Sequence, residues 1–279
     1  MIAAGFEYAA PDSLDEAIRL LGEGGEDAKL LAGGHSLIPL MKVRLAAPTL
    51  LVDLRRVPGL RGVSSEDSEL RIGAMTPHAE LADARAGLLA TAAGQIADQQ
   101  VRNRGTIGGS LAHGDPASDL PAVVLAAEAR VALRGAGGER EVAAGDLFED
   151  YLTTAVGADE VITEVRVPKL SGYGYGYEKF TRRAEDWAMV GVCALVKATD
   201  GTCEDVRVGL THMGSTALRA TAVEDALRGQ PLDASRIGSA AEQAAEGTSP
   251  PGDLNASPEY KQHLARVLCR RALLAAAGV

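Results

Sequence analysis

The chain has 279 residues, a length that corresponds to about two domains. With 46% hydrophobic and 24% charged residues, its composition is that of a folded globular protein and excludes a disordered one. Its 28 basic and 38 acidic residues give a formal net charge of −10. This balance excludes the broad basic surface on which nucleic-acid binding depends.

Small side chains supply much of the apolar fraction. The chain contains 32 glycines but only six tyrosines, three phenylalanines and one tryptophan. A core of this kind brings backbones close together and offers few aromatic rings to a ligand. A flat, conjugated ligand would therefore be held mostly by main-chain and aliphatic groups.

The sequence contains no targeting, membrane or metal-binding signal. No Lys or Arg precedes Arg19, unlike in a signal peptide, and the longest apolar run, near 122–127, is too short to span a membrane. We therefore expect a cytoplasmic protein. Cys193, Cys203 and Cys269 form no Cys-x-x-Cys pair and the five histidines share no ligand spacing, so we expect no metal or iron–sulfur site on this chain.

The first part of the chain predicts short helices and strands in mixed order. Apolar residues at helical spacing predict helices, and short apolar or alternating runs predict strands. We expect helices over 13–21, 37–44, 88–97 and 115–127, and strands over 29–32, 49–54, 69–73, 129–133 and 161–167. Pro116 is expected at the first position of its helix.

The last part predicts strands followed by helices. We expect strands over 175–181, 190–198 and 203–211, then helices over 217–227, 234–245 and 259–276. This order predicts a small separate α+β domain in which a three-stranded antiparallel sheet packs on helices. Gly172, Gly174 and Gly176 alternate just before it, which favours a flexible junction. We therefore expect one domain over 1–172 and another over 173–279.

A first glycine pair follows the strand expected over 29–32. In LLAGGHSL (30–37), Gly33 and Gly34 can both take positive φ, which lets successive backbone N–H groups converge on an anion. A short helix beyond them adds a partial positive charge that suits a diphosphate. Ser36 can add a hydroxyl donor. Such strand–turn patterns are common, so the pattern alone is a weak signal.

A second glycine pair has the same pattern in TIGGS (106–110), with hydroxyls from Thr106 and Ser110 on either side. Two such loops could clamp a diphosphate from two sides. Asp115 is expected to cap the helix that begins at Pro116. Asp119, four residues further on, is expected to accept hydrogen bonds from ligand hydroxyl groups.

Other nucleotide and hydrolase signatures are absent from the sequence. It contains no Gly-x-x-x-x-Gly-Lys-Ser/Thr, no Gly-x-Gly-x-x-Gly after a strand, and no Gly-x-Ser-x-Gly. The glycine alternation at 172–176 does not have the dinucleotide spacing. No motif points to a hydrolytic triad.

Several segments together resemble a known family. AGGHSLIPLMKVRLAAPTLLVDLRRV, TIGGSLAHGDPASDLPAVVLA, DEVITEVRVP, YEKFTRR and HLARVLCRRAL occur in this order and span essentially the whole chain. They are similar to the FAD-binding medium subunits of molybdenum hydroxylases of the carbon monoxide dehydrogenase and xanthine dehydrogenase family. The resemblance implies a two-subdomain FAD-binding domain of the PCMH type, like that of vanillyl-alcohol oxidase, before the small C-terminal domain.

The resemblance also implies which residues bind FAD, and none of them is expected to be catalytic. Ile96 and Ile162 would pack near the cofactor, and Lys179 would lie near the flavin ring, where its charge could favour the anionic reduced form. Ser110 departs from the Asn or Asp of many relatives. The residues that match are Leu31, Ala32, Gly33, Gly34, His35, Ser36, Leu37, Ile96, Thr106, Ile107, Gly108, Gly109, Ser110, Asp119, Ile162 and Lys179.

Three of these residues also have simpler interpretations. Lys179 could be a solvated charge on a strand, and Ile96 and Ile162 could be ordinary core residues that touch a cofactor only at an edge. Trp187, the single tryptophan, is more typical of a core or interface than of a ring stacked on a flavin.

The implied function is electron transfer within a larger complex. The molybdenum cofactor would lie on a large subunit and [2Fe–2S] clusters on a small subunit, with FAD on this chain passing electrons to an external acceptor. The family implies a dimer of heterotrimers. The alternatives are an autonomous FAD-dependent oxidoreductase of the same fold and a module that has lost its flavin. The substrate of the complex (carbon monoxide, a purine, a nicotine-like heterocycle or an aldehyde) and the acceptor stay open.

Overall fold

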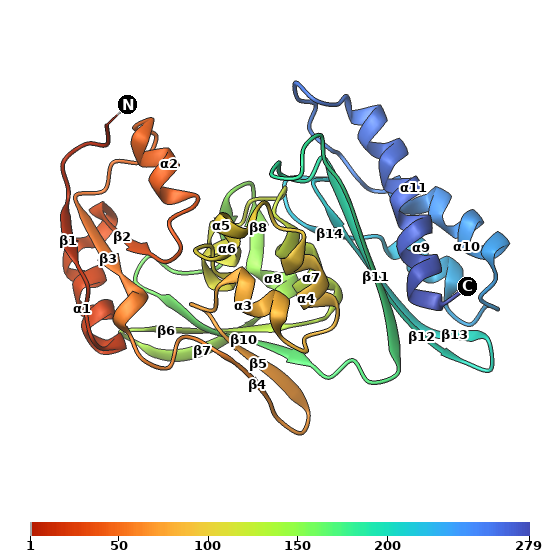
Figure 1. Ribbon diagram of the computed structural model, residues 1–279, viewed down its shortest axis with the longest axis horizontal. Helices are drawn as coiled ribbons and strands as arrows, with labels where there is room; N and C mark the ends of the chain where they lie inside the picture. Colours follow the sequence, from red (N-terminus) through yellow and green to blue (C-terminus); the bar gives the residue numbers. More distant parts are fainter. Residues whose placement is uncertain (1) are drawn as a thin grey trace.

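The computed structural model describes residues 2–279, which form three units in chain order (Figure 1). The N-terminal unit is a parallel sheet of order β1-β3-β2. Ser13 caps its first helix by accepting a backbone N–H bond, and Ala17 and Leu21 lie on the buried face of that helix. The elements are β1 Glu7–Ala9, α1 Leu14–Gly24, η1 Gly25–Asp27, β2 Ala28–Leu31, α2 Leu37–Lys42, β3 Leu50–Asp53 and η2 Leu54–Arg56.

The central unit is a five-stranded antiparallel sheet of order β4-β5-β10-β6-β7, covered by helices. Ile72, Val131 and Val165 belong to the largest core cluster. The elements are β4 Val63–Ser65, β5 Glu69–Gly73, α3 His78–Asp83, α4 Leu88–Gly94, α5 Gln99–Arg102, α6 Ile107–His113, α7 Asp119–Ala126, β6 Arg130–Gly135, β7 Gly138–Ala143, α8 Ala144–Leu147 and β10 Val161–Pro168. A separate pair, β8 Phe148–Asp150 and β9 Thr153–Thr154, lies between α8 and β10 in the chain.

The C-terminal unit is an antiparallel sheet of order β11-β12-β13-β14 with helices on one face (Figure 1). Its core contains Val192, Val208, Leu268 and Leu273. The elements are β11 Tyr173–Phe180, β12 Val190–Thr199, β13 Thr202–Thr211, β14 Leu218–Arg219, α9 Thr221–Leu227, α10 Ala234–Ala241, η3 Glu242–Ala245 and α11 Pro258–Ala277. The predicted α+β class is confirmed.

The C-terminal sheet has a fourth strand that the sequence did not predict. The helix expected from residue 217 begins only at Thr221, because Leu218 and Arg219 pair with β13. Arg219 then turns its guanidinium to Glu224, with 2.6 Å between Arg219 Nε and Glu224 Oε1. The prediction of three strands was therefore one short.

Two of the three alternating glycines, Gly174 and Gly176, are part of a strand, so the prediction of a flexible junction over this stretch was wrong. Gly174 and Gly176 lie in β11 and pair with β12. A Cβ on Gly174 would overlap the carbonyl oxygen of Ala276, and one on Gly176 would overlap that of Ala272. The glycines are needed because α11 crosses β11 at backbone distance.

The start of α7 also differs from the prediction. The helix begins at Asp119, after Ser118, and Pro116 lies outside it. Asp115 does not cap this helix. Its Oδ1 accepts the N–H of Ala117 at 2.8 Å and closes a turn before the helix. This turn places Asp119 at the first position of a buried helix.

The central and C-terminal units share a core. Tyr177, Cys193 and Leu195 of the C-terminal sheet belong to the largest cluster of the central unit. The thiol of Cys193 lies 3.4 Å from the carbonyl oxygen of Ala122 in α7. Across residues 2–279, no helix combines the length and apolar character needed to cross a membrane.

Candidate functional site

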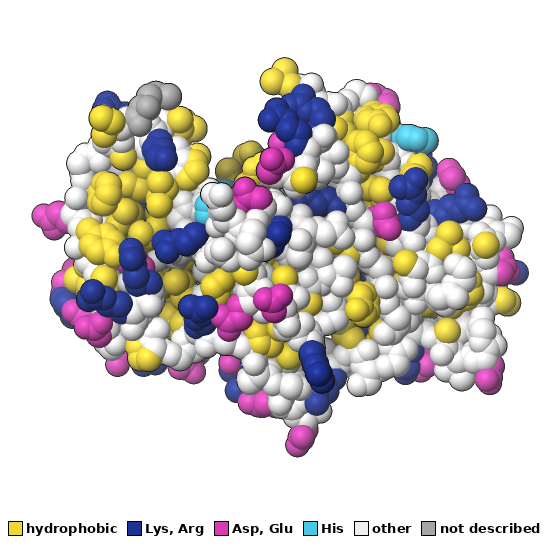
Figure 2. All heavy atoms as spheres, in the orientation of Figure 1, with side chains coloured by type: hydrophobic (Ala, Val, Ile, Leu, Met, Phe, Trp, Pro, Cys, Tyr) yellow, Lys and Arg dark blue, Asp and Glu magenta, His cyan; other side chains and the backbone are white. Residues whose placement is uncertain are grey.

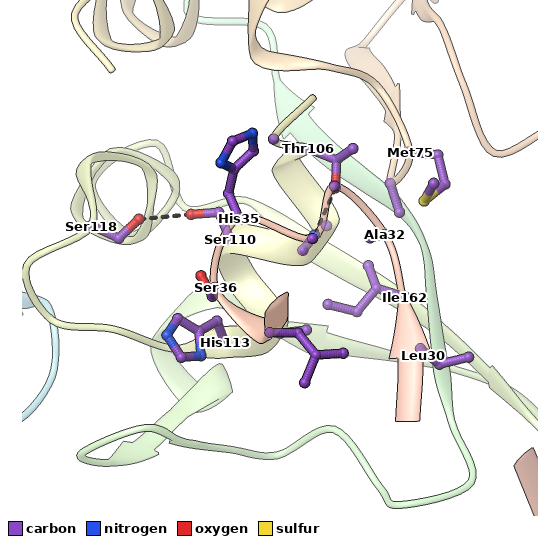
Figure 3. Close-up of a pocket in the computed structure, with 18 of the residues that line it drawn as sticks. Leu30, Ala32, His35, Ser36, Met75, Thr106, Ser110, His113, Ser118 and Ile162 are labelled. Atoms are coloured by element: carbon purple, nitrogen blue, oxygen red, sulfur yellow. Dashed lines mark hydrogen bonds between the residues drawn. The ribbon is translucent and has the colours of Figure 1, made fainter. Parts of the chain in front are cut away.

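A cavity of about 580 Å³ lies where the N-terminal unit, the helices of the central unit and the chain between β11 and β12 meet. Figure 2 shows the molecule hollowed between the N-terminal unit and the central helices. Figure 3 shows part of the lining, which comes from segments far apart in the sequence. The volume is in the range typical of cofactor sites.

The first glycine segment, defined as residues 32–37, forms one wall of this cavity. The chain leaves β2 after Leu31, turns at Gly34 with φ of 78°, and enters α2 at Leu37. Within residues 2–279, no hydrogen-bond acceptor is found for the backbone N–H groups of 33–37. The Ser36 hydroxyl makes no capping bond. Five successive N–H donors and one hydroxyl are thus free at the cavity wall.

Only one of the two glycines in this segment has the predicted conformation. Gly34 has positive φ, but Gly33 does not, so the expectation for Gly33 was wrong. Gly33 is needed for a different reason. A Cβ there would overlap the carbonyl oxygen of Arg104 and lie 2.7 Å from Cα of Gly105. The first segment therefore packs directly against the chain that leads into the second.

The second glycine segment, residues 106–110, is the start of helix α6 and not an open loop. Thr106 Oγ1 accepts the N–H of Gly109 at 3.1 Å as the helix cap. The N–H of Gly108 is donated to the carbonyl of Ala74 at 2.8 Å, and that of Ile107 to the carbonyl of Thr76 at 3.2 Å. Neither Gly108 nor Gly109 has positive φ, so that expectation was wrong.

The two segments lie side by side. A Cβ on Gly109 would be 3.3 Å from Cβ of Ala32. The Ser110 hydroxyl lies 2.7 Å from the Ser118 hydroxyl, as the dashed line in Figure 3 marks. The second segment thus supports the first and connects it to the turn before α7.

Fourteen of the sixteen predicted site residues line the cavity. Leu31 and Ile107 are the two that do not, because their side chains are buried in hydrophobic clusters. The fourteen are Ala32, Gly33, Gly34, His35, Ser36, Leu37, Ile96, Thr106, Gly108, Gly109, Ser110, Asp119, Ile162 and Lys179.

Asp119 and Lys179 form a buried ion pair at the cavity. Lys179 Nζ lies 2.9 Å from Asp119 Oδ2 and 3.2 Å from the carbonyl oxygen of Gln95. Tyr177 donates its hydroxyl to the other carboxylate oxygen. Both charged side chains are only 4% exposed, so the interpretation of Lys179 as a solvated charge was wrong.

Burial controls the protonation of this group. It raises the pKa of Asp119 above its ordinary value, against the attraction of Lys179. Burial, together with the charge of Asp119, raises the pKa of Tyr177 well above its ordinary value. Tyr177 is therefore a neutral donor. The cation of Lys179 is matched by the adjacent carboxyl group, not left alone in the cavity.

Two protein families match this chain. The family described as "FAD binding domain in molybdopterin dehydrogenase" matches residues 4–170, and the "CO dehydrogenase flavoprotein C-terminal domain" matches residues 175–276. The chain belongs to the family of FAD-binding medium subunits of molybdenum hydroxylases.

Individual members of this family are similar over their whole length. The carbon monoxide dehydrogenase medium chain of Hydrogenophaga pseudoflava is 44% identical, over 99% of this chain and 98% of its own. The 6-hydroxypseudooxynicotine dehydrogenase complex subunit alpha of Paenarthrobacter nicotinovorans is 39% identical, over 96% and 93%. A solved carbon monoxide dehydrogenase from H. pseudoflava has a chain with a TM-score of 0.96, 45% identity and coverage of 100% and 99%.

The cavity of this medium subunit contains a histidine that the sequence did not single out. His78 is buried, and its backbone N–H is donated to the carbonyl of Gly105 at 2.9 Å. Burial first, and then the nearby His35, lower the pKa of His78 to about 4, so its ring is neutral at pH 7. Its Nδ1 finds no hydrogen-bond partner among residues 2–279. His78 follows strand β5, as the first glycine segment follows β2. This position after a strand was the signal that could have marked His78 as a site residue.

Trp187 also lines the cavity, together with Glu185 and Asp186. Trp187 is 55% exposed, so it is not the core residue that its type suggested. These three residues belong to the segment between β11 and β12, which the sequence analysis left unassigned. Their place at the cavity depends on contacts between units, which no local pattern encodes.

Proposed function

We propose that the cavity holds FAD with its diphosphate against the first glycine segment. The observation that carries this proposal is the run of five unpaired N–H donors over residues 33–37, next to the free hydroxyl of Ser36. Converging backbone N–H groups form an anion site that needs no cationic side chain. His78 is neutral, so it adds no positive charge to this attraction.

The second glycine segment has a supporting role in this proposal. Its N–H groups at 107–109 are already donated within the protein, so they are not available to a phosphate. It lines the cavity with the surface of Gly108 and Gly109 and keeps the first segment in place through the contact with Ala32. The sequence analysis expected both segments to bind the diphosphate. In this proposal only the first segment binds it, and the second keeps the first in position.

The buried group around Asp119 is proposed to hold the polar part of the cofactor. Each oxygen of Asp119 accepts one bond from Tyr177 or Lys179 and retains a lone pair for a ligand hydroxyl. Ile96 and Ile162 offer apolar surface on the cavity wall. FAD, when bound, supplies a ring system that takes up and releases one or two electrons. The chain itself positions this ring and limits its contact with water.

We further propose that the chain works as the electron-transfer subunit of a three-subunit enzyme. It receives electrons from [2Fe–2S] clusters on a small subunit and delivers them to an external acceptor, while the substrate reacts at a molybdenum centre on a large subunit. A dimer of heterotrimers, a cytoplasmic location and a domain boundary at residues 172 and 173 belong to this proposal. The similarity of the whole chain to medium subunits supports it.

Purification of the tagged full-length chain from its native host tests the function. The proposal predicts FAD bound at a ratio near one per chain, together with a larger molybdenum-containing and a smaller iron–sulfur subunit. It also predicts that the separated chain oxidises no substrate by itself. Stoichiometric FAD with substrate turnover and no partner subunits would establish the autonomous oxidoreductase instead.

A further inference from the structure

A lysine with no exposed surface lies in the C-terminal unit, away from the ion pair of the cavity. Lys261 belongs to α11 and is completely buried. Its Nζ lies 2.7 Å from the carbonyl oxygen of Pro251, 2.7 Å from Asp253 Oδ2 and 3.3 Å from His212 Nε2. Burial raises the pKa of Asp253, but the hydrogen bond from Lys261, together with backbone N–H groups, outweighs burial and lowers this pKa to about 2. The carboxylate therefore stays ionised and compensates the ammonium.

Lys261 determines which nitrogen of His212 carries the proton. An ammonium group can only donate, so Nε2 of His212 must accept. Nδ1 is then the ring nitrogen that carries a hydrogen; it lies 2.9 Å from the carbonyl oxygen of Ala188 and donates to it. The backbone N–H of His212 is donated to the carbonyl of Pro116 at 2.8 Å, and its φ is 64°. His212 thus joins three separate segments.

The carbonyl of Ala188 ends the segment that lines the mouth of the cavity. We call residues 181–188 the rim segment. Glu185, Asp186 and Trp187 within it line the cavity, and most of its side chains are exposed. Over residues 2–279, the bond from His212 is the only hydrogen bond that joins the rim segment to another element. Its other contacts of this kind, such as the one from the N–H of Asp186 to the carbonyl of Arg183, are internal.

We infer that Lys261 and His212 are positioning residues that hold the rim segment, and with it Trp187, at the mouth of the cavity. Lys261 acts through His212: without the ammonium, the ring can place its proton on Nε2, and Nδ1 then no longer donates to Ala188. The importance of this cavity for FAD rests on the function proposed above. The placement of Trp187 by Lys261 and His212 does not depend on that proposed function.

The chain has a single tryptophan, so its fluorescence reports on the rim segment alone. The test compares the FAD-free full-length chain with its Lys261→Met and His212→Gly variants. Gly tolerates the positive φ at 212 and has no side-chain donor, so the second variant removes the bond to Ala188 without straining the backbone. The inference predicts a faster anisotropy decay and stronger quenching by acrylamide in both variants. In the FAD-loaded chain it predicts an FAD release rate about tenfold higher, which equals about 1.4 kcal/mol.

Glu224→Gln provides the matched control. Glu224 is also buried in the C-terminal unit, where it pairs with Arg219, but it makes no contact with the rim segment. The variant should lower stability to urea and leave the tryptophan signal unchanged. Equal changes of Trp187 fluorescence in the Lys261 and Glu224 variants, or no change in the His212 variant, would overturn the inference. A chain that binds no FAD but shows the predicted fluorescence changes would refute only the proposed function.

Discussion

The two glycine segments have the same sequence pattern but different structural roles. The first, 32–37, ends a strand and leaves its N–H groups from 33 to 37 unpaired, with Gly34 at a φ of 78°. The second, 106–110, begins a helix whose cap, Thr106, and whose neighbours Ala74 and Thr76 accept its N–H groups. One segment is open to a ligand, and the other is closed by its own fold.

This difference shows that a glycine pair alone does not define an anion site. What matters is whether other parts of the chain already accept the N–H groups. In the first segment, the glycines make a turn and a close contact with Arg104. In the second, they allow α6 to approach Ala74 and Ala32. Substitutions that separate ligand binding from stability therefore test the comparison.

The largest effect is expected for Gly34→Val. A β-branched residue is strained at a φ of 78°, and its Cβ would lie 2.7 Å from Cδ1 of Ile38. The turn must change, and the N–H groups no longer converge. We expect FAD affinity, measured by flavin fluorescence titration, to fall at least about a thousandfold, or about 4 kcal/mol.

Gly59→Val is the control for backbone strain. Gly59 has a φ of 80° and no atom within 4 Å of a Cβ built on it. The substitution should reduce stability but leave FAD affinity within about twofold. Equal loss of FAD in both variants would show that general destabilisation, and not the first segment, is responsible.

The neutral state of His78 makes stability depend on pH. Its pKa is about 4 in the folded chain and about 6.5 when unfolded, so between these values only the unfolded chain takes up the proton. The stabilisation is complete above pH 6.5 and is lost as pH falls towards 4, by an amount on the order of 3 kcal/mol. In His78→Gln, urea denaturation should show this slope removed. A slope identical to that of the parent chain would mean that folding does not lower the pKa of His78.

Gly108→Ala should show the opposite pattern to Gly34→Val, with a loss of stability and no loss of FAD affinity. Its Cβ would lie 2.8 Å from the carbonyl oxygen of Ala74, so we expect a loss of about 2 kcal/mol in the free energy of unfolding. The FAD dissociation constant of the folded fraction should not change. Gly94→Ala, whose nearest neighbour would be 3.9 Å away, is the control and should not destabilise the chain. A fall in FAD affinity at unchanged stability would give the second segment the ligand-binding role.

The smallest expected effects separate the two hydroxyl groups. Thr106→Val removes the cap of α6 and should cost about 1 kcal/mol in stability, with little change in FAD affinity. Ser36→Ala removes a hydroxyl that makes no capping bond, so it should leave stability unchanged and weaken FAD binding about fivefold to tenfold. Thermal denaturation and fluorescence titration of both variants measure this difference. Weaker FAD binding in Thr106→Val and lower stability in Ser36→Ala would show that the second segment binds FAD and the first has the structural role.

Most helices and strands could be predicted from the sequence because their apolar periodicity is local. The failures have two causes, a local turn and contacts between distant residues. Ser118, and not Pro116, precedes α7 because the turn closed by Asp115 comes first. Gly174 and Gly176 are explained only by α11, about 100 residues further along the chain. Local patterns cannot reveal such approaches.

The same distinction between local patterns and distant contacts applies to the candidate site. The two glycine segments and Asp119 could be proposed from local sequence patterns, whereas Ile96, Ile162 and Lys179 could be proposed only from the resemblance to the family. The roles of the two segments could not be predicted, because the acceptors for the second segment, Ala74 and Thr76, lie some 30 residues earlier. The contact from Lys261 through His212 to the segment of Trp187 likewise joins distant residues, and no motif marks it.

The central claim is that backbone N–H groups of the first segment, and not of the second, bind the diphosphate of FAD. The most direct measurement uses the chain labelled with ¹⁵N-glycine and loaded with FAD, and detects scalar coupling between ³¹P and amide protons across hydrogen bonds. The account predicts coupling at Gly33 or Gly34 and none at Gly108 or Gly109. Coupling at Gly108 or Gly109, with none at Gly33 and Gly34, would contradict it.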